Sequence, residues 1–122
     1  MLEMYEIKVK SNFSSAHSLK NYRGKCERLH GHNWNIEAVF AYKSLGRDGL
    51  AIDFREARSM LSAVLEKLDH SHLNSLKILK GMNPTSENIA KFIYGSIKKR
   101  CAGIRSVSVW ENENSCATYS EG

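Results

Sequence analysis

The chain lacks the features of a secreted or membrane protein. Its 122 residues include only three cysteines, an odd number without the spacing of a disulfide framework, and this usage favours a reducing compartment. Residues 1–10 mix acidic, basic and apolar side chains without a signal-peptide core, and no apolar run approaches the length of a membrane span. We therefore expect a cytoplasmic protein without a membrane partner.

Blocks of like charge and repeated segments are also missing. The formal net charge is +5, but the 18 lysines and arginines are scattered along the chain. Nucleic-acid binding is typical of a basic stripe with interleaved aromatic residues, so we expect no nucleic-acid partner, and an anionic small substrate fits the charge at least as well. The length suits one domain over residues 1–122, without linker or low-complexity tract.

Hydrophobic periodicity predicts four strands and two helices. Alternation of apolar and polar residues predicts the strands, which are residues 4–13, 33–42, 104–111 and 115–119. Helical spacing predicts one helix that begins at Asp53 and a second that begins near Pro84 and Thr85 and ends at residues 98–100.

This order of elements predicts an α+β fold, a four-stranded antiparallel sheet with two helices on one face. The other face and both edges of such a sheet would stay open, so we expect several copies to join edge to edge into a larger barrel. Residues 14–32, between the first two strands, form a long polar and basic segment. Long irregular segments inside compact domains are usually functional.

Three histidines in this segment predict a metal site. His30 and His32 are two residues apart, so an extended chain would direct both imidazoles to one side. His17, at the end of the preceding strand, could complete a three-histidine set, which suits zinc and leaves a fourth position open. Cys26 is then a reactive thiol beside the metal or a fourth ligand. A purely structural Cys/His knuckle is disfavoured because no second paired motif is present.

An aspartate and a histidine follow the first predicted helix. Asp69 could fix the tautomer of His70, and His70 could exchange a proton with Cys26, as in known catalytic triads. An acidic helix end beside a histidine also occurs by chance, so the pair alone is a weak signal. His72 is the lesser candidate, with a structural or surface role as the simpler interpretation.

A carboxylate at the end of an apolar strand needs a partner. Glu111 shares its face with Val107 and Val109, where burying an unpaired charge would cost much free energy. One partner is a lysine or arginine of the same protein. The other is a ligand with two adjacent N–H donors, such as the amino-pyrimidinone edge of a pterin or guanine. The residues alone leave both possibilities open.

Several pieces of sequence, spread over nearly the whole chain, occur in the order of one known family. The pieces are Phe13-Ser14-Ser15-Ala16-His17, Cys26-x3-His30-Gly31-His32, Asp53-Phe54, Leu68-Asp69-His70-x-x-Leu73-Asn74, Pro84-Thr85-x-Glu87-Asn88 and Val109-Trp110-Glu111 with Ala117-x-Tyr119. The set resembles the 6-pyruvoyltetrahydropterin synthase superfamily. The three residues between Cys26 and His30 resemble its bacterial 6-carboxy-5,6,7,8-tetrahydropterin synthase branch, of queuosine biosynthesis, whereas the pyruvoyl-pterin enzymes typically have five.

The resemblance implies an architecture and a metal. It implies a tunnelling fold in which three subunits form a barrel and two trimers stack into a homohexamer. It also implies that His17, His30 and His32 bind zinc.

The resemblance further implies the catalytic and substrate-binding residues. Cys26 corresponds to the catalytic thiol, with Asp69 and His70 as its partners. Glu111 corresponds to the pterin anchor, and Thr85 lies in a motif expected to contact the substrate. In the family, the thiol and the Asp-His pair of one site come from neighbouring chains.

The implied substrate is a pterin triphosphate, 7,8-dihydroneopterin triphosphate, and the implied products are 6-carboxytetrahydropterin, acetaldehyde and triphosphate. Because the chain has no glycine-rich phosphate loop, scattered cations such as Lys20, Arg23 or Lys25 would hold the triphosphate. Glu27 is an alternative proton acceptor, since some relatives use a glutamate. A pyruvoyl-pterin synthase, a dihydroneopterin aldolase and a zinc-stabilised binding module without chemistry are the rival functions.

Overall fold

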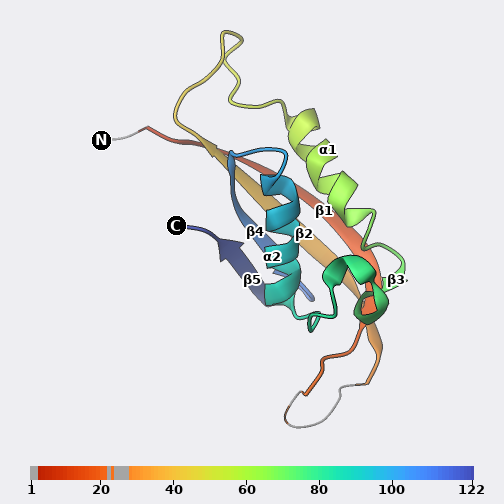
Figure 1. The fold of residues 1–122 in the computed structure, drawn as a ribbon. Coiled ribbons are helices and arrows are strands. Elements are labelled where there is room, and N and C mark those ends of the chain that lie inside the picture. The colour runs from red at the N-terminus through yellow and green to blue at the C-terminus, as the bar shows by residue number, and fades with distance from the viewer. Residues whose placement is uncertain (1–2, 22, 24–27) are drawn as a thin grey trace.

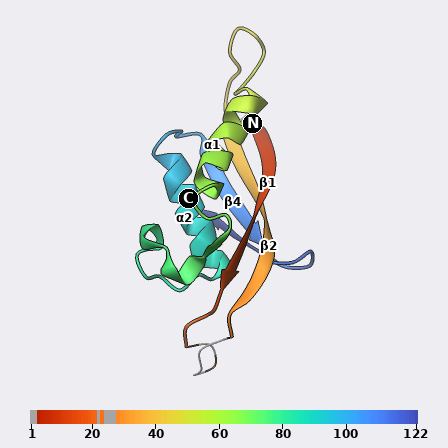
Figure 2. The same ribbon diagram turned by 90° about the vertical axis from the view of Figure 1, so that its right-hand side faces the viewer.

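A five-stranded sheet with two helices on one face forms the fold (Figures 1 and 2). The computed structural model describes residues 3–21, 23 and 28–122. The elements in chain order are β1 (Tyr5–His17), β2 (His30–Tyr42), α1 (Phe54–Leu65), β3 (Ser71–His72), the short 3-10 turns η1 (Leu73–Ser75) and η2 (Lys77–Leu79), α2 (Ser86–Lys98), β4 (Ile104–Trp110) and β5 (Cys116–Ser120). Among the described residues, no helix is both long enough and apolar enough to cross a bilayer.

The α+β class and the position of both helices on one face are confirmed, but the four-strand prediction is wrong. The strand order is β3-β1-β2-β4-β5, and β3 pairs with β1 in parallel, so the sheet is not wholly antiparallel. Two residues of polar sequence carry no periodic signal, and for this reason β3 could not be recognised. The sheet of a single chain stays open at both ends.

β1 and β2 also extend into the segment that was predicted to be irregular. β1 continues to His17 and β2 begins at His30, four and three residues beyond the predicted ends. Apolar alternation stops there, but polar contacts continue the pairing. The Ser14 hydroxyl donates to Asn33 Oδ1 at 2.6 Å, and the Ser15 hydroxyl donates to the Leu68 carbonyl. Strand pairing here depends on hydrogen-bond partners far away in the sequence.

Both helices begin at side-chain caps. Asp53 accepts a hydrogen bond from the Arg55 N–H at 2.8 Å, and Thr85 accepts one from the Asn88 N–H at 3.1 Å. Such caps satisfy N–H groups that the first helical turn leaves without partners. α2 packs on β4 and β5 and α1 on β1, so both apolar stripes are buried against the sheet.

Trp34 lies at the centre of the core, at the end of the sheet where β1 ends and β2 begins. Its side chain is fully buried, its ring stacks on Phe13 with centroids 5.6 Å apart, and its indole N–H donates to the Ser15 carbonyl at 3.1 Å. Aromatic pairs of this kind contribute about 0.5–1.5 kcal/mol beyond the burial of area. The ring therefore fixes how β1 and β2 face each other.

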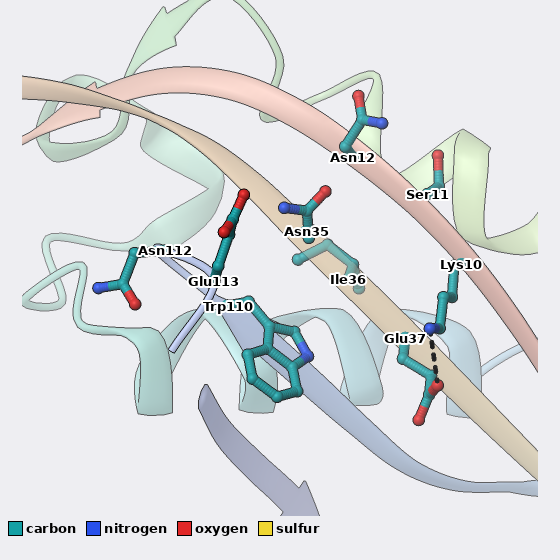
Figure 3. A pocket seen from close by; sticks show the side chains of 9 residues that line it. All are labelled: Lys10, Ser11, Asn12, Asn35, Ile36, Glu37, Trp110, Asn112 and Glu113. Carbon is teal, nitrogen blue, oxygen red and sulfur yellow. Dashed lines mark ion pairs between the residues drawn. The ribbon is translucent and has the colours of Figure 1, made fainter. Parts of the chain in front are cut away.

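The face of the sheet opposite the helices is polar. Lys10, Asn12, Asn35 and Glu37 project from β1 and β2 beside Trp110 of β4 (Figure 3), around a hollow of about 450 Å³. None of the predicted site residues lines this hollow. The candidate site has to be sought on the helical side.

Candidate metal centre

The pairing of β1 with β2 brings the three predicted histidines together. His17 lies directly opposite His30, and Ser15 lies opposite His32. Because side chains alternate along a strand, all three imidazoles project from the same face. The ring centroids are 4.7 Å apart for His17 and His30, 5.2 Å for His17 and His32, and 4.7 Å for His30 and His32.

One nitrogen from each ring lies within 4.8 Å of the other two. The His17 Nδ1–H donates to the Pro84 carbonyl at 2.7 Å, and the His30 Nδ1–H donates to the Arg28 carbonyl at 2.8 Å. A carbonyl only accepts, so in the neutral form both rings carry their proton on Nδ1 and present Nε2 as a lone-pair donor. Metal-binding histidines are typically oriented by such a second hydrogen bond.

His17 is the most enclosed member of the cluster. Its side chain is 0% exposed, and its Nε2 is buried without a hydrogen-bond partner among the described residues. Leaving a buried polar group unsatisfied costs about 1–3 kcal/mol. A cation bound between the three rings would satisfy this nitrogen, so the donor set fits a metal. The Trp34 ring packs against this cluster, with its centroid 4.7 Å from the His17 centroid and 5.5 Å from the His32 centroid.

Glu111 lies beside this cluster. Its Oε2 is 3.7 Å from His32 Nε2, and its Oε1 accepts a hydrogen bond from the Ser86 hydroxyl at 2.8 Å. Among the described residues, the basic side chain that lies within 4.0 Å of the Glu111 carboxylate is therefore a histidine of the cluster and not a lysine or arginine. One carboxylate thus connects the end of β4 to β2 and to the first turn of α2.

A hollow of about 220 Å³ opens next to Glu111. It is lined by Ser86, Glu87, Glu111, Asn112, Ser115, Cys116 and Ala117. Neither Ser86 nor Cys116 could be predicted as a site residue, since neither follows a recognisable chemical spacing in the sequence. Thr85 directly precedes Ser86 at the start of α2. Its oxygen caps this helix, and its hydroxyl proton stays available for donation.

Asp69 and His70 form the predicted pair, but at the edge of the sheet beside β3. Asp69 Oδ1 accepts from the Ser14 N–H at 2.9 Å, and Asp69 Oδ2 is 3.4 Å from His70 Nε2. The His70 side chain is 83% exposed, and the residue has a positive φ of 50°. The carboxylate therefore orients the imidazole, which faces outward from the chain.

Cys26, Glu27 and Lys25 lie outside the described residues. His72 is exposed, with its Nδ1 3.1 Å from the Ser75 hydroxyl, and is not a member of the histidine cluster.

Two cations and a second cysteine complete the set of candidates. Lys20 is exposed and donates from Nζ to the Gly81 carbonyl at 3.0 Å, and Arg23 is exposed. Cys101 lies with its Sγ 3.3 Å from the Tyr42 hydroxyl, and burial together with this contact raises the pKa of Tyr42. Cys101 is thus engaged with the other end of β2, away from the three histidines.

The chain is similar to known proteins over most of its length. A family described as 6-pyruvoyl tetrahydropterin synthase matches residues 6–122. A 6-carboxy-5,6,7,8-tetrahydropterin synthase from Synechocystis is 34% identical, over 95% of this chain and 93% of the relative. A dihydroneopterin monophosphate aldolase from Pyrococcus furiosus is 34% identical, over 86% of this chain and 88% of the relative.

The fold is similar to solved structures as well. The 6-pyruvoyl tetrahydropterin synthase of Caenorhabditis elegans superposes with a TM-score of 0.86 at 23% identity, covering 99% of this chain and 98% of that chain. The family match extends over nearly the whole chain and includes all three histidines and Glu111. The chain therefore belongs to the 6-pyruvoyl tetrahydropterin synthase family.

Proposed function

We propose that this protein is a zinc-dependent 6-carboxytetrahydropterin synthase. It would convert 7,8-dihydroneopterin triphosphate and one water into 6-carboxy-5,6,7,8-tetrahydropterin, acetaldehyde and triphosphate, in the cytoplasm, as a step of queuosine biosynthesis. The observation that carries the proposal is the cluster of His17, His30 and His32 next to Glu111 in a chain of this family.

The histidine cluster is the proposed zinc site. His17, His30 and His32 would supply three nitrogen ligands, which is the usual set for a catalytic zinc with one open position. Zinc, when bound, supplies a Lewis acid that polarises substrate oxygens and makes an adjacent C–H more acidic. The Pro84 and Arg28 carbonyls keep two of the rings in the tautomer that this requires.

Glu111 is the proposed anchor of the pterin ring. A carboxylate accepts two charge-assisted hydrogen bonds from the adjacent N–H groups of an amino-pyrimidinone edge. Ser86 holds one of its oxygens, which restricts the rotation of the carboxylate. The other oxygen of Glu111 is 3.7 Å from His32 Nε2. A pterin ring bound to Glu111 would therefore direct its own side chain along the metal site. Thr85, at the start of α2, would donate its hydroxyl proton to the same ring.

Cys26 is the proposed base, through its thiolate, for a C–H proton of the substrate side chain. Its assignment depends on the Cys26-x3-His30-Gly31-His32 spacing. His70, oriented by Asp69, would then exchange that proton with the thiol.

We propose that the Asp69-His70 pair serves the site of a neighbouring chain in a homohexamer of two stacked trimers. Its outward direction and 83% exposure support this, because within one chain the imidazole faces solvent. The open edges of the sheet also favour strand pairing between copies.

The first prediction concerns the metal. Purified protein should hold about one zinc ion per chain by elemental analysis. His30→Ala should lose it, because two imidazoles cannot replace three, whereas His72→Ala, outside the cluster, should keep it. Cys26→Ala should also keep zinc. Zinc retained by His30→Ala, or lost by Cys26→Ala, would contradict the assigned ligand set.

The second prediction concerns the product. Incubation of the zinc-loaded protein with 7,8-dihydroneopterin triphosphate should give 6-carboxytetrahydropterin by mass spectrometry and an equal amount of trapped acetaldehyde. The Cys26→Ala protein, with its metal retained, is the matched control and should give neither. A 6-pyruvoyl product without acetaldehyde would indicate the pyruvoyl branch, and cleavage without a 6-carboxyl group would indicate an aldolase. No turnover in the presence of bound zinc would favour a binding module.

The third prediction concerns the shared site. Cys26→Ala and His70→Ala should each be inactive, but refolding them together should restore part of the wild-type activity, because some interfaces then pair an intact Cys26 with an intact His70. Native mass spectrometry checks that mixed oligomers form. Mixed oligomers as inactive as the two separate variants would rule out a site completed by a neighbour.

A further inference from the structure

The outer edge of β1 is covered by the long connection between α1 and α2. The Ser14 N–H donates to Asp69 Oδ1 at 2.9 Å, and the Ser14 carbonyl accepts from the His70 N–H at 2.6 Å. The following residues pair with β3. β3 is only two residues long, so it ends before the extended chain does, and the backbone beyond His17 needs other partners.

Two asparagine side chains supply these partners. The Ser18 N–H donates to Asn74 Oδ1 at 2.9 Å, and Asn74 Nδ2 donates to the Ser18 carbonyl at 2.7 Å. The Lys20 N–H donates to Asn83 Oδ1 at 2.8 Å, and Asn83 Nδ2 donates to the Lys20 carbonyl at 3.2 Å. A primary amide offers the same acceptor and donor as a peptide group, so each asparagine replaces one residue of a missing strand.

Asn83 is itself fixed to the start of α2. Its carbonyl accepts from the Thr85 N–H at 2.8 Å and from Asn88 Nδ2 at 2.9 Å. The next residue, Pro84, accepts the Nδ1–H of His17 at 2.7 Å. The dipeptide Asn83-Pro84 therefore holds the backbone beyond His17 through the Asn83 side chain, and it holds the His17 ring through the Pro84 carbonyl.

We propose that Asn74 and Asn83 are positioning residues of the metal centre. Through the two amide–peptide pairs they hold the backbone on the carboxyl side of His17, while Pro84 holds its ring, so that the buried Nε2 is directed between the other two imidazoles. Neither asparagine is one of the three proposed ligands. The inference rests on the metal-binding part of the proposed function and adds residues that determine how well the site is formed before metal binds.

The test is a Co²⁺ titration of the metal-free protein, followed by visible absorption, for Asn83→Ala, Asn74→Ala and the control Asn114→Ala in the exposed turn between β4 and β5. Loss of a group that hydrogen-bonds directly to a metal ligand typically weakens metal affinity by about 10–100-fold. Because the two asparagines act through the backbone next to His17, the lower part of this range applies. We expect this increase in Kd, with altered ligand-field bands, for Asn83→Ala and Asn74→Ala, and a Kd within about twofold of wild type for Asn114→Ala.

Thermal unfolding of each metal-free variant separates positioning from a merely structural role. A lower melting temperature with an unchanged Co²⁺ Kd and spectrum would overturn the proposal, because the amides would then only stabilise the edge of β1. Failure of both variants to fold, with or without metal, would overturn it as well. If the wild-type protein binds no Co²⁺, the proposed metal centre itself is wrong, which is a distinguishable result.

Discussion

The pairing of His17 with His30 across β1 and β2 is the constraint on which the rest of the site depends. Strand side chains alternate strictly, so a slip of one residue would direct His30 and His32 to the polar face of the sheet. Trp34 opposes such a slip, because its buried ring stacks on Phe13 and its indole donates to the β1 backbone. Core packing therefore sets the register, and the register brings the three histidines together.

Around this pair, the polar groups of the site come from distant parts of the chain. The Pro84 carbonyl reaches His17 from the segment before α2, Glu111 reaches His32 from the end of β4, and Ser86 holds Glu111 from the first turn of α2. Three elements thus converge on one end of β1 and β2.

Much of this could be predicted from the sequence. The His30 and His32 spacing indicated a shared face because the period of a strand is two residues. The caps at Asp53 and Thr85 marked both helix starts because the first turn needs acceptors from nearby side chains.

What could not be predicted depends on contacts between residues far apart in the chain. β3 and the extra residues of β1 form because residues 68–83 supply hydrogen-bond partners from their backbone and amide side chains. No local sequence pattern predicts these partners. The partner of Glu111 was left open for the same reason, since His32 is 79 positions before it in the sequence. Thr85 was predicted at the start of the second helix and as a substrate contact, and in the structure its oxygen caps α2.

The most direct measurement of the central claim is zinc X-ray absorption of the metal-loaded wild-type protein. A site made by the β1–β2 register predicts three imidazole nitrogens at about 2.0–2.1 Å with one further oxygen ligand. A sulfur neighbour at about 2.3 Å, or fewer than three imidazoles, would mean that the ion is held in another way and would contradict the account.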